Sequence, residues 1–444
     1  MRTLKLSNIF YALFIYCSLT SDAHAYLDPG TGSLLFSAIL GLVSTIYFWG
    51  KSLIHKSIHL YSVVTGKKVD INDRGADIVF YSEGAQYWNT FKPVIEALSK
   101  LDVPVTYWTS DKSDPALAHD LSTMTAKFIG KGNKAYSRLN MMHAKVCVST
   151  TPGLDVLQIK RSKGVEHYIH LVHAPTTGTY KLYSFDYFDS VMCSGQHQID
   201  AIRELETKRG SKAKKLWETG CTYMDVLADQ IDNKTHPTDK KSPTKTVLVA
   251  PSWGENGLLT RFGESLVIEL LNSGFNVILR PHPNSQIVEK DLLANLKNSL
   301  EKYEHLIWDH NPSGFDSLNK ADVLISDFSG IVFDFAFAFE KPVITAEFKV
   351  QLNGLDANDL ANGLWELSVL DLLGKRVCHN DMAKLPNIVN SLLESNSYKG
   401  QDLRNMRDKS IFNYGNAGNI AANQILTILN NNKLFDTKAD NPSL

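Results

Sequence analysis

Beyond about residue 70, short apolar runs rich in β-branched residues alternate with stretches whose apolar residues recur at helical spacing. The first such run, 78–81, precedes a helical pattern of apolar residues from Trp88 to Leu98. Further strand-like runs lie at 103–108, 145–149, 167–172 and 190–193. This alternation is typical of an α/β fold in which helices cover both faces of a parallel sheet.

The pattern stops at residues 230–245, which are polar, contain two prolines and form no apolar cluster, so they are typical of an exposed linker. A second array follows, with strand-like runs at 246–250, 276–279, 306–308, 322–326 and 342–345. A chain of 444 residues is also too long for one ordinary domain. We therefore predict two Rossmann-like domains facing across a cleft, over 76–229 and 246–430, with a tail at 431–444. Ligands of such sheets bind at the carboxyl ends of the strands.

The N-terminus holds two apolar segments. Residues 1–25 have a basic start, a short apolar stretch and a small-x-small ending, as in a signal peptide. The run 29–50 carries no charge and is long enough for a hydrocarbon core of about 30 Å, so we predict a transmembrane anchor over 26–51 and a juxtamembrane linker over 52–75.

Lysines follow this anchor, which predicts a single-pass protein of the inner (cytoplasmic) membrane with its body in the cytoplasm. Two alternatives stay open: the second segment is a buried helix of a soluble fold, or both segments form a retained hairpin.

Composition excludes some classes of function. The formal net charge of −1 argues against a chain-wide attraction to nucleic acid. The five cysteines show no CxxC spacing, which argues against a zinc ribbon or a disulfide framework. No DxD-like acidic pair stands at a convincing strand end, so we expect neither an obligatory metal nor another cofactor.

The strongest local signal is the segment 323–334, in which an apolar run ends in small polar residues and a second apolar run begins. The start of a helix presents unpaired N–H groups and a partial positive charge, which suits a phosphate. The donor-binding candidates of this segment are therefore Ser326, Asp327, Ser329, Gly330 and Asp334. The alternative is a plain Ser N-cap without a ligand. Neither GxGxxG nor a P-loop motif is present.

Two further segments of the second half supply candidates. In Arg280-Pro281-His282-Pro283 the prolines stiffen the turn around His282, and the guanidinium of Arg280 suits phosphate oxygens. Ser252 and Trp253 follow the first strand-like run of this half and would border the donor, although Trp253 packing at an interface is an alternative.

In the first half, His173 follows a strand-like run and precedes a polar loop that contains Thr176 and Thr177. An imidazole can accept a hydroxyl proton near neutral pH, so His173 is the candidate general base. His170 is interpreted as structural. The turn Ser82-Glu83-Gly84 would border the acceptor side of the cleft, and a simple turn explains it equally well.

Together these motifs resemble the CDP-glycerol glycerophosphotransferase family of teichoic-acid polymerase and primase type, which has a GT-B fold. The resemblance rests on the His173 loop, 219–225, 250–253, 280–283 and 326–334, with 341–344 beyond. It implies that His173 is the base, and that His282, Asp327 and Ser329 lie at the donor. The chain departs from the family at two points: Ala174 replaces a common Gly, and Gly330 replaces a common second Ser.

The resemblance implies a membrane-anchored transferase that moves glycerol phosphate, or a related polyol phosphate, from a CDP-activated polyol to a lipid-linked or polymeric envelope acceptor. One alternative is a GT-B glycosyltransferase or a UDP-sugar 2-epimerase relative. Another is a non-catalytic GT-B scaffold of envelope assembly, against which the presence of both His173 and His282 argues.

Overall fold

A computed structural model describes residues 77–156, 158–234, 244–311, 313–348 and 352–439. The predicted signal peptide, membrane anchor and juxtamembrane linker lie outside these residues, as does most of the predicted interdomain linker. Within the described residues, no helix combines the length and the apolarity that crossing a bilayer requires.

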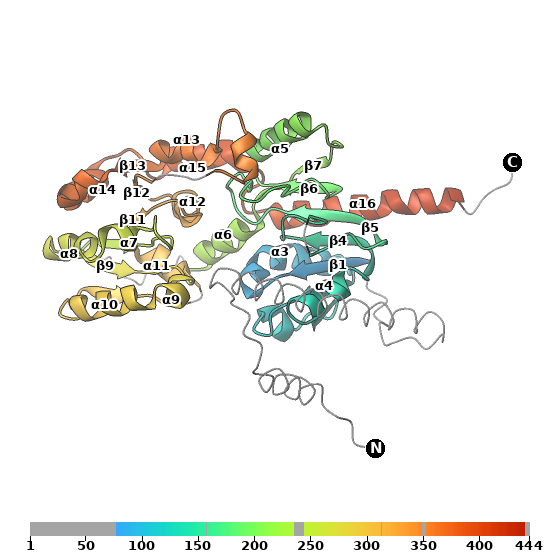
Figure 1. Cartoon of the computed structure of the whole chain (residues 1–444), viewed down its shortest axis with the longest axis horizontal. Coiled ribbons are helices and arrows are strands. Elements are labelled where there is room, and N and C mark those ends of the chain that lie inside the picture. The colour runs from blue at the N-terminus through green and yellow to red at the C-terminus, as the bar shows by residue number, and fades with distance from the viewer. Residues whose placement is uncertain (1–76, 157, 235–243, 312, 349–351, 440–444) are drawn as a thin grey trace, which may run out of the picture. The chain divides into compact units, whose positions relative to one another are not determined.

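The first half of the fold is built on a seven-stranded sheet (Figure 1). Its order is β3-β2-β1-β4-β5-β6-β7, and every neighbouring pair is parallel. Strands β2 and β3 are thus added on one side of β1, and strands β4 to β7 follow in order on its other side, as in a doubly wound fold. The strands are β1 (Ile78–Ser82), β2 (Val105–Thr109), β3 (Met124–Phe128), β4 (His143–Ser149), β5 (Gly164–Leu171), β6 (Ser190–Cys193) and β7 (Lys215–Glu218).

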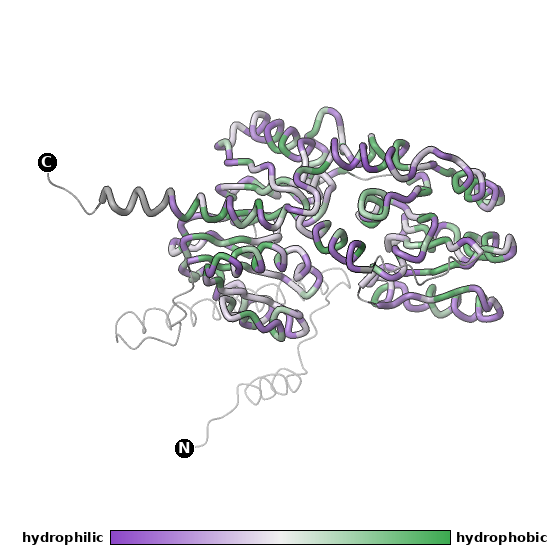
Figure 2. The backbone as a smooth tube through the Cα atoms, turned by 180° about the vertical axis from the view of Figure 1, so that it is seen from behind, coloured by the Kyte–Doolittle hydropathy of each residue, from purple (hydrophilic) through white to green (hydrophobic). Residues whose placement is uncertain are grey.

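Helices cover this sheet by packing apolar residues on its buried strands. The apolar residues predicted at helical spacing form one side of the first long helix, and they pack on the buried strands. In Figure 2 the helices alternate between green and purple along their length, as helices with one apolar and one polar face do. The helical elements are η1 (Ala85–Tyr87), α3 (Trp88–Ser99), η2 (Pro115–Ala118), α4 (Asn133–Leu139), α5 (Gln196–Arg209) and α6 (Thr222–Lys234).

The second half repeats the same topology in a six-stranded parallel sheet of order β10-β9-β8-β11-β12-β13. The strands are β8 (Thr246–Val249), β9 (Asn276–Leu279), β10 (Leu306–Trp308), β11 (Val323–Ser326), β12 (Val343–Ala346) and β13 (Gly374–Val377). Its helices are α7 (Leu258–Phe262), α8 (Ser265–Asn272), α9 (Ser285–Val288), α10 (Lys290–Leu300), α11 (Phe315–Lys320), α12 (Ile331–Phe333), the π-helix η3 (Asp334–Ala338), η4 (Asp356–Asp359), α13 (Trp365–Leu373), η5 (His379–Lys384), α14 (Leu385–Glu394) and α15 (Gln401–Ser410).

The last helix, α16 (Ala417–Ala439), packs on the first half and not on the second, where its place in the sequence would put it. Ala421 and Ile425 belong to the same apolar core as Phe91 of α3. Gly418 permits this approach, since a Cβ there would lie 2.6 Å from the Cβ of Pro93. The second domain predicted over 246–430 includes the start of α16, so this crossing is not apparent from the sequence. The predicted α/β class with two parallel sheets is confirmed.

Candidate active site

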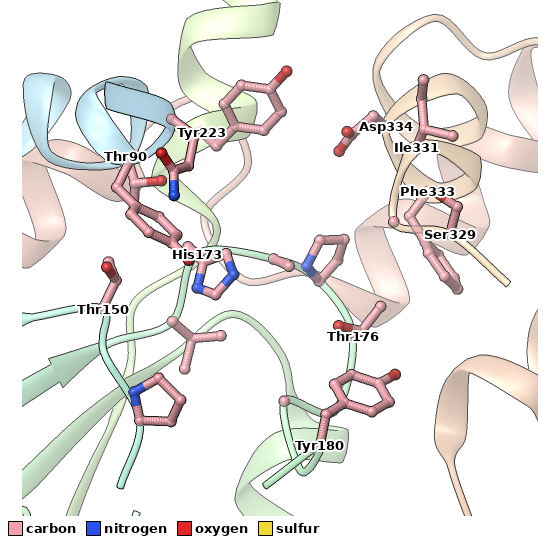
Figure 3. A pocket seen from close by; sticks show the side chains of 18 of the residues that line it. Thr90, Thr150, His173, Thr176, Tyr180, Tyr223, Ser329, Ile331, Phe333 and Asp334 are labelled. Atoms are coloured by element: carbon pink, nitrogen blue, oxygen red, sulfur yellow. The ribbon is translucent and has the colours of Figure 1, made fainter. Parts of the chain in front are cut away.

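A cavity of about 790 Å³ lies where the carboxyl ends of strands from both sheets meet. The first half contributes residues that follow β1, β4 and β5, and the second half contributes residues that follow β9 and β11. Figure 3 shows the imidazole of His173 projecting into the cavity, with Thr150 on one side and Ser329 and Asp334 across from it. This is the position at which doubly wound sheets bind ligands.

His173 stands two residues beyond the end of β5, and its ring packs edge-on against Tyr87 with the centroids 5.1 Å apart. The side chain is exposed toward the cavity. The surrounding protein nevertheless removes enough water to lower the pKa of the imidazole to about 4, well below the usual value of ~6.5. The ring is therefore neutral at pH 7 and has a lone pair with which to accept a proton.

His170 also borders the cavity, but its side chain is only 3% exposed. Its ring lies between Phe185 and Phe188, at centroid distances of 4.9 and 5.0 Å, and its Nδ1 has no hydrogen-bond partner among the described residues. Burial, followed by the nearby His173, lowers the pKa of His170 to about 3. This environment fits the structural role expected for His170.

His282 faces the cavity from the turn after β9. The backbone N–H of Asn284 donates to its Nδ1 at 3.1 Å, so the neutral ring carries its proton on Nε2. Burial lowers the pKa of His282, which keeps the ring neutral near pH 7. The Nε2–H group is thus a hydrogen-bond donor that the local backbone orients. Trp253 lies beside this ring, 46% exposed, but does not line the cavity.

Asp327 borders the cavity, yet both of its carboxylate oxygens already accept backbone hydrogen bonds. They come from Ser252 at 2.8 Å and Leu258 at 2.9 Å. The carboxylate therefore joins the turn after β11 to the loop after β8, and burial raises its pKa. Ser252 takes part through this bond and does not line the cavity. Ser326 is fully buried, and its hydroxyl donates to the carbonyl of Ala250 at 2.6 Å, so its predicted donor contact is replaced by a structural one.

Ser329 and Gly330 border the cavity where the chain turns into α12. A Cβ built on Gly330 would meet no atom within 4 Å, so space is open in front of this backbone. The first N–H groups of a helix have no intrahelical partner, and here those at Gly330 and Ile331 stand at the cavity. Asp334 follows one turn later, and burial raises the pKa of its carboxyl to about 7.

Arg280 does not line the cavity. Its Nη1 donates to the Asp309 carboxylate at 2.6 Å, and both side chains are largely buried. This ion pair corrects the expectation that the guanidinium of Arg280 faces the donor phosphates. Asp309 could not have been identified as its partner from the sequence, because it follows a different strand.

Some of the candidate residues of the first half line the cavity, and others form structural hydrogen bonds away from it. Glu83 and Thr176 line the cavity. Ser82 and Gly84 do not, because the Ser82 hydroxyl donates to the Gly84 carbonyl at 2.8 Å and closes the turn. Thr177 is also buried away from the cavity, and its backbone N–H donates to Glu366 of the second half at 3.2 Å.

Several lining residues were not predicted. Thr150 directly follows β4 and Tyr87 ends the short helix η1 after β1, so their places near strand ends were visible signals. Tyr180, Lys181 and Tyr223 lie on loops or helices whose direction only the fold determines. Of the described residues that line the cavity, Lys181 is the only lysine or arginine.

Residues 68–352 match the family model described as CDP-Glycerol:Poly(glycerophosphate) glycerophosphotransferase, a range that contains His173, His282 and Ser329. No curated protein matches the chain.

Among solved structures, the wall teichoic acid polymerase TagF is similar with a TM-score of 0.52 and 18% identity, over 86% of this chain and 98% of that chain. The UDP-GlcNAc 2-epimerase of Methanocaldococcus jannaschii is similar with a TM-score of 0.51 and 15% identity, over 80% of this chain and 98% of that chain. The UDP-GlcNAc 2-epimerase of Neisseria meningitidis is similar with a TM-score of 0.52 and 12% identity, over 79% of this chain and 99% of that chain. At these identities the similarity shows the GT-B-like fold alone.

Proposed function

The chain belongs to the CDP-glycerol:poly(glycerophosphate) glycerophosphotransferase family, and from this premise we propose that it transfers glycerol phosphate, or a related polyol phosphate, from a CDP-activated donor to a lipid-linked or polymeric acceptor of the cell envelope. One observation carries the proposal: His173 and the turn 329–331 come from different sheets and line the same cavity. A base and a phosphate site in one cavity are what a transfer to a hydroxyl requires. The similarity to a wall teichoic acid polymerase supports an envelope polymer as the acceptor.

The donor diphosphate would bind at the start of α12. The N–H groups at Gly330 and Ile331 and the Nε2–H of His282 would donate to its oxygens, with the Ser329 hydroxyl beside them. Asp334 lies next to this position, and a carboxyl with a pKa of about 7 is partly protonated near neutrality, which reduces its repulsion of phosphate.

His173 would act on the acceptor. Its neutral ring would take the proton of the acceptor hydroxyl while that oxygen forms a bond to the phosphorus that carries glycerol. The bond from this phosphorus to the bridging oxygen would break, and CMP would leave with the electron pair. The negative diphosphate would raise the pKa of His173 in the complex, which makes the ring a stronger base there than in the free enzyme.

Membrane anchoring belongs to this proposal. Its support is the charge-free run 29–50, followed by Lys51 and Lys56, which would hold the body on the cytoplasmic side. Protease added to spheroplasts should leave the C-terminal tail intact and digest it only after lysis. Digestion from outside would show the orientation to be reversed.

The activity is tested with the full chain in detergent, supplied with CDP-glycerol, other CDP-polyols and UDP-sugars in parallel. The expected result is release of CMP that increases when a glycerol-phosphate oligomer is added. Release of UDP with such an acceptor would instead favour a glycosyltransferase, and conversion of UDP-GlcNAc without any acceptor would favour an epimerase. No turnover of any donor would favour the scaffold alternative.

A further inference from the structure

The loop that follows the candidate base, residues 174–184, is here called the base loop. Thr176, Gly178, Tyr180 and Lys181 of this loop line the cavity. From its own half, the loop is held at both ends. At its end, the Arg209 guanidinium of α5 lies 4.9 Å from the centroid of the Tyr183 ring, and the backbone N–H of Gly153 donates to the Ser184 carbonyl at 2.9 Å. At its start, α5 supplies two contacts. The side-chain amide of Gln198 donates to the carbonyl of Thr176 at 2.6 Å, and a ring nitrogen of His197 lies 2.6 Å from the carbonyl of Pro175.

The middle of the base loop, and the backbone N–H groups at its end, are held from the second half, by the connection between β12 and β13. Two carboxylates there are each 0% exposed, Asp356 of η4 and Glu366 of α13. Asp356 accepts the backbone N–H groups of Tyr183 at 2.7 Å and Ser184 at 2.8 Å. The backbone N–H of Ala357, next to Asp356, also donates to the carbonyl of Thr179 at 3.0 Å.

Glu366 holds the part of the base loop that is nearer His173. One of its oxygens accepts both the backbone N–H and the hydroxyl of Thr177, and the other accepts the hydroxyl of Tyr180. These donors use both oxygens. Glu366 therefore holds the loop at Thr177, which lies between two lining residues, and at Tyr180, which itself lines the cavity.

The two carboxylates differ in how their charge is met. Asp356 pairs with Arg209, whose Nη2 lies 2.6 Å from its Oδ1. Glu366 forms no ion pair within the part of the chain that the structure describes, and burial raises its pKa. A buried carboxylate without a cation is costly unless hydrogen bonds satisfy it. The base loop supplies those hydrogen bonds, so the loop and Glu366 stabilise each other's positions.

We propose that Glu366 is a positioning residue: from the half that holds the donor, it fixes the base loop of the other half and thereby the place of the His173 imidazole relative to the donor. The inference rests on the proposed function, because it assigns His173 the role of base. Thr177 is four residues beyond His173, and Pro175 between them limits how far the intervening backbone can absorb a shift.

The test compares Glu366→Ala with Glu366→Gln in the full chain. Alanine removes every acceptor for Thr177 and Tyr180. Glutamine keeps one oxygen for Thr177, and its amide can donate to the Tyr180 hydroxyl, which turns round to accept. We expect Glu366→Ala to lower kcat about 10- to 100-fold, since a misplacement of the base by about 1 Å has an effect of this order. The KM for the donor should change little, because Glu366 does not line the cavity.

Glu366→Gln should recover most of the lost kcat. The matched control is Glu206→Ala, which removes a carboxylate that is also buried but pairs with Lys214 within the first half. It should keep a kcat near that of the wild type. A kcat of Glu366→Ala near the wild-type value would overturn the proposal, as would an equal loss in Glu366→Gln and Glu366→Ala, which would point to the charge itself.

Hydrogen exchange separates this inference from the proposed function, because it needs no turnover. In Glu366→Ala the amide of Thr177 should exchange faster than in the wild type, while those of Tyr183 and Ser184 keep their protection by Asp356. Unchanged exchange at Thr177 would overturn the inference whether or not the wild type turns over a CDP-polyol. Faster exchange in an enzyme without activity on any donor would support the positioning of the base loop by Glu366 and refute the proposed function.

Discussion

Replacing His170 by phenylalanine should make the stability of the protein less sensitive to acid. The folded protein holds this imidazole neutral, with a pKa of about 3, whereas an unfolded histidine protonates near ~6.5. As the pH falls through this window, the unfolded chain binds a proton that the folded chain does not. The contribution of His170 to the free energy of unfolding is therefore full above about pH 6.5 and is lost progressively toward pH 3.

The magnitude follows from the two pKa values. Each pH unit within the window is worth about 1.4 kcal/mol, so His170 should account for about 2 kcal/mol of the stability lost between pH 7 and pH 5. The phenyl ring keeps an aromatic contact with Phe185 and Phe188, and it removes an Nδ1 that has no partner among the described residues. Other histidines titrate equally in both proteins and cancel in the comparison.

The measurement is urea unfolding of the wild type and His170→Phe at pH 7, 6 and 5, followed by tryptophan fluorescence. Val191→Ala is the control, since it removes buried apolar volume from a neighbouring cluster and should lower stability by the same amount at each pH. If His170→Phe and the wild type show the same pH slope, the imidazole is hydrated or charged in the folded protein. The exclusion of water from this side of the cavity, which also explains the low pKa of His173, would then be refuted.

Three further predictions concern the proposed reaction. His173→Ala should lower turnover about 10²- to 10⁴-fold with donor affinity nearly unchanged. In the wild type, the acidic limb of the pH profile of kcat/KM should report a group with a pKa near 4 and not near ~6.5, and in His173→Ala this limb should vanish. Near-normal turnover of His173→Ala would instead show that His173 is structural. His282→Ala should weaken both donor binding and rate, since its Nε2–H is placed beside the diphosphate, and calorimetry that shows wild-type affinity would contradict this. Gly330→Val should abolish donor binding but leave the circular dichroism unchanged, because a side chain there enters open space and not the core; intact binding would move the phosphates elsewhere.

The parallel sheets were predictable because their central strands are buried on both faces and so stand out as continuous apolar runs. β9 and β10 fall where the sequence predicts them, and β8 and β11 differ by one residue at an end. The strands that are not apparent from the sequence are β3, β7 and β13, each of which is an edge strand of its sheet. β3 alternates half-buried with exposed residues, and β7 has exposed ends, so neither carries a continuous apolar signal. Edge strands need less apolar sequence because one side of them meets solvent.

The cavity lining was predictable where a side chain follows a strand and faces the cavity from there, as with His173, His282 and Ser329. It was not predictable where the role depends on a partner from elsewhere in the chain. Arg280 looked like a phosphate ligand until the fold brought Asp309 against it. Glu366 gave no local signal at all, since its hydrogen-bond donors lie almost two hundred residues earlier in the sequence.

The hydrogen bonds and pKa values of three carboxylates explain how a cavity with one lysine among its described lining residues could receive a diphosphate. Asp327 directs its charge into two backbone N–H groups, and Glu366 directs its charge into the base loop. Asp334, which makes no ion pair in the described residues, has its pKa raised to about 7 by burial. Each of these three acidic groups is thus hydrogen-bonded or partly neutral, so backbone dipoles and an oriented imidazole meet less opposing charge. Recognition by fixed dipoles also suits a phosphoryl group whose charge shifts during transfer, because these donors need not reorganise as CMP leaves.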